Sequence, residues 1–111
     1  MDALHQAIRS LDRDGFIARC NYSCCQTCGV AEISQEAAAQ SPAPQFYVFW
    51  HEQDEEGRLR HGTVYLSYGS LDGEADARAN REAGEKIVAR LRELGVPVTW
   101  KGNPGTRILA G

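Results

Sequence analysis

The stretch QFYVFWH at residues 45–51 decides the fold. Aromatic and β-branched side chains occupy both alternating faces of this segment, which is typical of a strand in the interior of a sheet. The polar residues 52–62 interrupt the pattern, and TVYLSY at residues 63–68 then alternates with Val64, Leu66 and Tyr68 on one face. We therefore predict two strands of one sheet, the second with a buried face and a semi-polar face that contains Tyr65.

Segments with helical periodicity precede and follow these strands in the sequence. We predict a first helix capped by Asp2 and ended by Gly15, a second ended by Pro42, and a long third helix that buries Ala83, Ile87, Leu91 and Leu94. The helices are expected at residues 2–14, 30–40 and 75–94, and three further short strands at 16–20, 96–100 and 107–110. This order predicts an α+β domain with a ferredoxin-like split β-α-β sheet, an additional N-terminal helix, an extra C-terminal strand, and helices mainly on one face. An α+β sheet of different strand order is the alternative.

Length and composition restrict the class of protein. The chain has 111 residues, 42% of them hydrophobic, with 12 Lys and Arg against 15 Asp and Glu and a net charge of -3. These values predict a single domain over residues 1–111. The longest apolar run, residues 46–50, is far shorter than the roughly 20 residues of a membrane span, so we expect a cytoplasmic protein with no membrane association. The acidic balance argues against a nucleic-acid partner.

The cysteines mark the candidate site. Four of them fall within nine residues, at Cys20, Cys24, Cys25 and Cys28, between a predicted strand and a predicted helix. A metal site, a redox or nucleophilic thiol pair, and burial of small apolar side chains are the three competing explanations. The start of a helix favours thiolates, because its backbone N–H groups have no intrahelical partners.

A zinc site is the first of these explanations. Its ligands would be Cys28 with Cys24 or Cys25, completed from Cys20, His51 or His61, because a closed structural site uses four ligands. In the redox explanation Cys25 and Cys28 form a pair. The more exposed thiol attacks a substrate disulfide, and the other thiol resolves the mixed disulfide that results.

A second group of candidate residues follows the central strand. His51 would ligate the metal or act as a base toward Cys25, and Glu52 or Asp54 would orient its ring. The alternative is a strand-end histidine with only a local role. The sequence leaves open whether the protein is an enzyme. It also leaves open an interaction module with inert thiols, which would form a homodimer through the Tyr65 face.

Three blocks together resemble a bacterial family catalogued as a domain of unknown function. They are the CCxxCG block at residues 24–29, the HxQD block at residues 51–54 and the YLxYG block at residues 65–69. The likeness spans roughly residues 16–109, and Cys20 falls outside it. The resemblance implies that the marked polar positions of the family are Cys24, Cys25, Cys28, His51, Gln53 and Asp54. It implies no activity.

Overall fold

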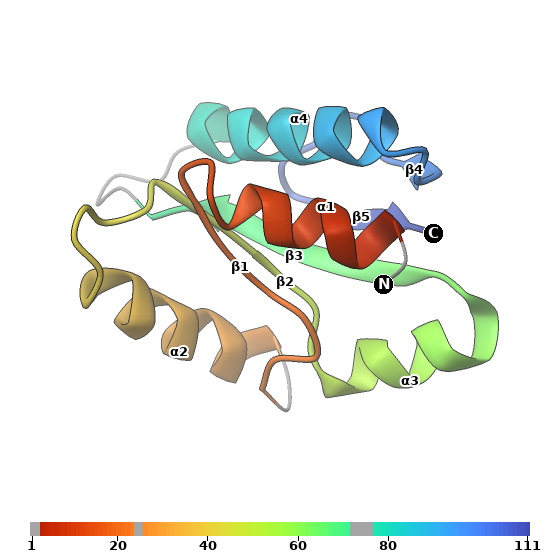
Figure 1. Ribbon diagram of the computed structural model, residues 1–111, viewed down its shortest axis with the longest axis horizontal. Helices are drawn as coiled ribbons and strands as arrows, with labels where there is room; N and C mark the ends of the chain where they lie inside the picture. Colours follow the sequence, from red (N-terminus) through yellow and green to blue (C-terminus); the bar gives the residue numbers. More distant parts are fainter. Residues whose placement is uncertain (1–2, 24–25, 72–76) are drawn as a thin grey trace.

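The computed structural model describes residues 3–23, 26–71 and 77–111. Four helices and five strands follow one another along this part of the chain (Figure 1). They are α1 (Ala3–Leu11), β1 (Phe16–Arg19), α2 (Gln26–Ala38), β2 (Phe46–Phe49), α3 (Glu52–His61), β3 (Val64–Ser70), α4 (Ala77–Glu93), β4 (Val98–Thr99) and β5 (Ile108–Ala110). The α+β class is confirmed, and both the N-terminal helix and the C-terminal strand are present.

The strands form one mixed sheet in the order β1-β2-β3-β5-β4. Strands β1 and β2 are parallel neighbours, and the other three pairings are antiparallel. No strand lies between β1 and β2, so the split β-α-β arrangement is absent and the alternative of a different strand order is the one observed. The physical reason lies in β2, which is apolar on both faces and therefore takes an interior position.

Helices cover both faces of the sheet (Figure 1). One core joins α1 and α4 to alternate strand residues that include Phe16, Ala18 and Val48. A smaller core on the opposite face packs α2 against the sheet through Ile17, Ile33, Ala37 and Phe49. The expectation of helices mainly on one face is therefore wrong, because Phe49 and Ile17 point away from α1 and need their own cover.

Several boundaries differ from the expected ones. Helix α2 begins at Gln26, four residues before the expected start, so Cys28 lies in its first turn. Leu94 is 39% exposed, because α4 ends at Glu93 and Gly95 turns the chain with a φ of 80°. The expected burial of Leu94 is therefore wrong, whereas Ile87 and Leu91 are buried as predicted. The Asp2 cap and the first two residues of the third predicted helix, 75–76, lie outside the described residues.

Helix α3 occupies the polar stretch of residues 52–62 that interrupts the strand pattern of the sequence. His51 caps its N-terminus in a reciprocal capping box with Asp54, and Gly62 ends it in the left-handed conformation. Acidic residues fill its first turn and basic residues its last, which complements the helix dipole. The helix has no apolar stripe and no buried residue, so hydrophobic periodicity could not predict it.

Gly84 provides a test of the packing between α4 and the sheet. A Cβ atom there would lie 2.6 Å from the Trp100 ring and 3.1 Å from the Tyr68 ring. The two rings cannot withdraw freely, because Trp100 Nε1 donates a hydrogen bond to Tyr68 Oη at 3.0 Å. We predict that Gly84→Ala lowers the free energy of unfolding in urea by about 1–3 kcal/mol.

Gly57→Ala in α3 is the matched control, because nothing lies within 4 Å of a Cβ atom there. This change should raise stability by about 0.5–1 kcal/mol, since alanine restricts the unfolded chain more than glycine does. Equal effects of the two substitutions would contradict the packing described.

Candidate functional site

Two backbone hydrogen bonds tie the segment before the cysteine turn to the start of α3. Tyr22 N donates to Trp50 O at 2.7 Å, and Glu52 N donates to Ser23 O at 3.0 Å. Ser23 therefore lies beside His51 at the end of β2. Cys24 and Cys25 lie outside the described residues, so the distance from their sulfur atoms to the His51 ring stays a prediction.

The two described cysteines lie in different surroundings. Cys28 is exposed in the first turn of α2. A Cβ atom on the next residue, Gly29, would overlap the Phe49 ring, so this turn of α2 lies directly on the sheet. Cys20 is half-buried and packs against the core that α1 and α4 cover, on the face opposite to α2.

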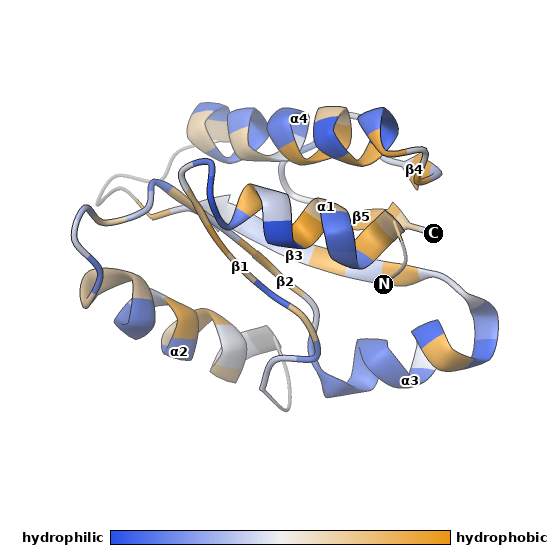
Figure 2. Ribbon diagram, in the orientation of Figure 1, coloured by the Kyte–Doolittle hydropathy of each residue, from blue (hydrophilic) through white to orange (hydrophobic). Residues whose placement is uncertain are grey.

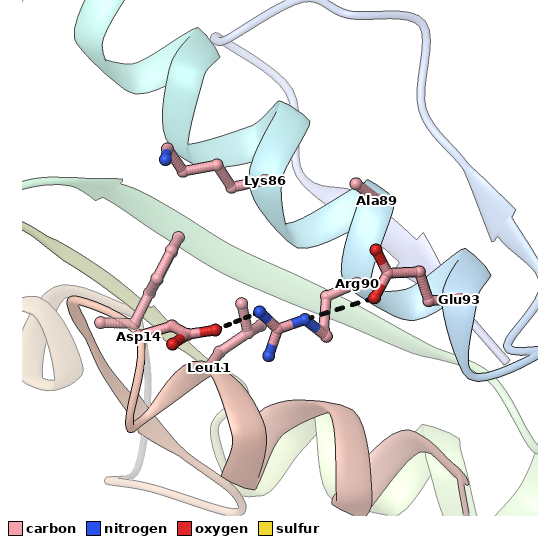
Figure 3. A pocket seen from close by; sticks show the side chains of 7 residues that line it. Leu11, Asp14, Lys86, Ala89, Arg90 and Glu93 are labelled. Carbon is pink, nitrogen blue, oxygen red and sulfur yellow. Dashed lines mark hydrogen bonds and ion pairs between the residues drawn. The ribbon is translucent and has the colours of Figure 1, made fainter.

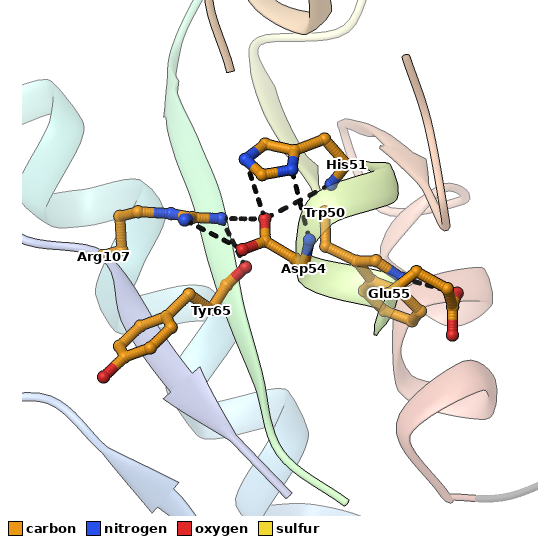
Figure 4. Close-up of polar contacts among 6 residues, drawn as sticks. All are labelled: Trp50, His51, Asp54, Glu55, Tyr65 and Arg107. Atoms are coloured by element: carbon orange, nitrogen blue, oxygen red, sulfur yellow. Dashed lines mark hydrogen bonds and ion pairs between the residues drawn. The ribbon is translucent and has the colours of Figure 1, made fainter. Parts of the chain in front are cut away.

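His51 is a buried N-cap (Figure 4). Its Nδ1 accepts a hydrogen bond from Asp54 N at 3.3 Å, and its Nε2 lies 3.1 Å from Asp54 Oδ2. Nδ1 therefore acts as an acceptor, and Nε2 faces the carboxylate. Both ring nitrogens therefore face Asp54, and the side chain of His51 is only 8% exposed.

Arg107 is the site residue that the sequence reasoning missed. Its guanidinium forms a two-pronged ion pair with Asp54, in which Nη1 donates to Oδ1 at 3.1 Å and Nη2 donates to Oδ2. Nη2 also donates to the carbonyl of Tyr65 at 2.6 Å (Figure 4). Arg107 follows a Gly-Asn-Pro-Gly turn and lies 53 residues after Asp54, so no local pattern could connect the two.

Buried polar atoms without a described partner gather around this corner of the molecule. They are Ser23 Oγ, Ser67 Oγ and Arg107 Nε. Asn21 and Ser23 have φ values of 50° and 67°, which are costly for residues other than glycine. Strain and unsatisfied polar atoms both concentrate where proteins carry out chemistry, so we take this corner as the candidate functional site.

Two tyrosines near α2 titrate above their ordinary range. Burial, with help from the Glu36 carboxylate, raises the pKa of Tyr22 to about 12, and the Tyr22 hydroxyl donates to Glu36 Oε2 at 2.9 Å. Burial is also the main cause that raises the pKa of Tyr47. Tyr47 lines a groove of about 440 Å³ between α2 and the sheet, together with Val30, Ser34 and small residues. Both hydroxyls therefore stay protonated at neutral pH.

A second hollow, of about 340 Å³, lies between α1 and α4 (Figure 3). Arg90 of α4 forms an ion pair there with Asp14, in the turn after α1, and a second one with Glu93 of its own helix. Lys86 lines the same hollow with its ammonium 6.0 Å from the centre of the Phe46 ring. None of the described candidate site residues lines this hollow, which lies on the opposite face of the sheet from α2.

Tyr65 is 52% exposed on β3, whereas its neighbours Val64 and Leu66 are buried. The guanidinium carbon of Arg107 lies 5.7 Å from the centre of the Tyr65 ring. The semi-polar face expected of this strand is thus present at Tyr65, and self-association through it stays a prediction.

Comparison with known proteins identifies the family. The chain belongs to the family described as a domain of unknown function, DUF6891, whose family model matches residues 1–110. The expected membership of an uncharacterised domain family is confirmed. No curated protein and no solved structure matches the chain. Among the helices that the structure describes, none has the length and apolar character that a membrane crossing requires.

The Asp54–Arg107 ion pair can be tested by a matched pair of substitutions. Removing one partner of a fully buried pair costs about 3–5 kcal/mol, and Arg107 is 26% exposed, so we predict that Arg107→Gln lowers the free energy of unfolding by about 2 kcal/mol. The control is Arg60→Gln, which removes an exposed pair with Glu56 in the same helix. Its effect should stay below about 0.5 kcal/mol. Similar losses for both variants in urea unfolding would show that Arg107 contributes no more than a surface charge.

Proposed function

We propose that the protein is a thiol–disulfide redox protein whose reactive pair is Cys25 and Cys28. The observation that carries this proposal is the exposed position of Cys28 in the first turn of α2, which Gly29 holds directly against Phe49. The unsatisfied N–H groups of a first helical turn stabilise a thiolate, and exposure lets a substrate disulfide reach it.

The described geometry favours this chemistry over a closed zinc site. Both nitrogens of His51 face Asp54, Cys20 packs on the other face of the sheet, and His61 is exposed at the far end of α3. The ligands left near the start of α2 are the thiols of Cys24, Cys25 and Cys28. A closed structural zinc site needs four ligands. Among the described residues alone, no three metal-ligating side chains converge.

The reaction is a two-step exchange with a substrate disulfide, R–S–S–R. One cysteine thiolate attacks a substrate sulfur, forms a mixed disulfide and expels the first RS⁻. The second cysteine thiolate attacks the protein sulfur of that mixed disulfide, closes the Cys25–Cys28 disulfide and expels the second RS⁻. Two electrons pass from the protein dithiol to the substrate. The two protons of the cysteine thiols end on the two RSH products.

His51 and Asp54 have a positioning role in this proposal. The His51 ring accepts from the α3 backbone and contacts Asp54, so neither nitrogen is available as a base in this arrangement. The two residues instead hold the start of α3, whose first amide binds Ser23 in the segment just before Cys24. Their substitution should therefore change the geometry of the turn rather than remove a proton acceptor.

Zinc is the second candidate for the same thiols. Three cysteines within five residues supply three of the four ligands, and solvent or a substrate would supply the fourth at an open site. The exposure of Cys28 to solvent fits an open zinc site better than a closed structural site.

Oxidation by a small neutral disulfide, hydroxyethyl disulfide, tests the proposal. The reduced wild-type protein should lose two hydrogen atoms in mass and form an intramolecular disulfide. Cys25→Ser and Cys28→Ser should instead stop at the mixed disulfide, which mass spectrometry detects as an added half-reagent. Cys20→Ser is the matched control and should oxidise as the wild type does.

Two results would overturn the proposal. Stoichiometric zinc in protein purified without chelator, released on Cys28→Ser, would assign the thiols to metal binding. Four thiols that alkylate slowly, with neither zinc nor a disulfide, would assign them to packing.

A further inference from the structure

An open groove lies between α2 and the sheet, on the face of the sheet opposite to α1 and α4. Its volume is about 440 Å³, which is within the roughly 300–1,000 Å³ of typical small-molecule sites. The helix contributes Val30, Ser34, Ala37 and Ala38, and Tyr47 of β2 lies on the sheet side. None of the described residues of the cysteine turn or of the capping box of α3 lines this groove, so it does not belong to the candidate site described above.

The groove exists because the small core beneath α2 is filled at only one end of the helix. In the first turns, Gly29 lets α2 approach the Phe49 ring, and Ile33 is fully buried. Toward its end the helix carries Ala37 and Ala38 on this side, and their methyl groups leave the space in front of the strands unfilled. Hydrophobic and hydrophilic residues alternate along α2 (Figure 2), so no continuous apolar stripe closes the gap. Protein cores leave few voids larger than a water molecule, so a gap of this size beside a core marks a candidate binding site.

Tyr47 supplies the polar group of the groove. Its ring lies across Gly69, its partner on β3, since a Cβ atom on Gly69 would lie 2.9 Å from Tyr47 Oη. Two other tyrosines, Tyr22 and Tyr68, donate their hydroxyl groups to described acceptors. Among the residues that the structure describes, the Tyr47 hydroxyl has no such acceptor. This hydroxyl is therefore available to donate to a bound molecule.

The chemistry of the lining restricts the ligand. No charged side chain is present among the described residues that line the groove, so a charged ligand would lose hydration without gaining a partner. Burial raises the pKa of Tyr47, so its hydroxyl stays protonated at neutral pH and acts as a donor. The Ser34 hydroxyl already donates to Val30 O at 2.8 Å. A matching ligand is neutral, apolar over most of its surface, and carries an oxygen that accepts a hydrogen bond.

We propose that this groove binds a small neutral molecule with an apolar body and a carbonyl oxygen. The apolar body lies between the alanines of α2 and the side chain of Leu71, which follows β3. The carbonyl oxygen accepts a hydrogen bond from Tyr47 Oη. The site uses no cysteine, so it goes beyond the proposed redox function and its outcome is independent of that function.

Amide chemical shifts measured by NMR test the site in the full chain. Acetophenone combines a phenyl ring with a ketone oxygen, and we expect it to bind with a Kd of about 1 mM, as its size allows. The amides that shift should be those of the residues that line the groove, in α2 and at positions 43–47 and 70–71. The proposal is overturned if acetophenone leaves these amides unchanged.

A substitution that fills the groove tests where the ligand lies. Ala38→Leu should weaken acetophenone binding about tenfold, because the larger side chain occupies the space that the ligand needs. Ala31→Leu is the matched control, since Ala31 is an exposed residue of α2 that does not line the groove. This control should bind within about twofold of the wild type. Equal binding by the two variants would place acetophenone elsewhere and overturn the proposal.

Ethylbenzene separates the hydrogen bond from the apolar contact, because it has a methylene group where acetophenone has its carbonyl. Tyr47→Phe should weaken acetophenone binding about fivefold, which is the effect of one hydrogen bond. The same substitution should leave ethylbenzene binding within about twofold of the wild type. Equal effects of Tyr47→Phe on the two compounds would overturn the assignment of Tyr47 as the donor.

Discussion

The structure depends on a strand that must be covered from both sides. Val48, Phe49 and Trp50 are fully buried although they point alternately to opposite faces of the sheet. Strand β2 therefore needs a neighbour on each edge and helices on each face. The α1 and α4 layer covers Val48 and Trp50, and α2 covers Phe49. The three-layer arrangement, the interior position of β2 and the close approach of α2 to the sheet follow from this requirement.

The candidate site lies where that burial ends. Just beyond Trp50 the chain passes from a largely apolar strand into a mostly polar helix, and packing gives way to hydrogen bonds and ion pairs. His51 is at the boundary, buried like the strand and capping the helix. Polar contacts depend on exact partners, so a helix held in this way is more easily released than one held by burial. The corner combines a buried apolar floor with a helix that is attached by polar contacts.

The sheet also divides the cysteines. Counting four thiols within nine residues overstates the ligands that one site can collect, because strand alternation turns Cys20 toward the core under α1 and α4. The start of α2 carries Cys28 on the other face, in solvent. Cys20 and Cys28 are thus only eight positions apart in the sequence, but they lie on opposite sides of the sheet. This division favours chemistry that needs two thiols over a closed site that needs four ligands.

Local pattern was sufficient for much of the fold. The alternation of residues 45–51 and 63–68 predicted β2 and β3, and the helical stripe with Ile87 and Leu91 predicted α4. These predictions succeeded because the periodicity of an element and its buried face are both visible within a short segment of sequence. Likewise, the cysteine cluster and the HxQD block marked the corner that the structure supports best. Strand order, the layer beneath Phe49, helix α3 as a docked element and the pairing of Arg107 with Asp54 were decided by tertiary structure alone. Each depends on contacts between segments far apart in the chain, and a polar helix that buries nothing leaves no periodic signal to detect.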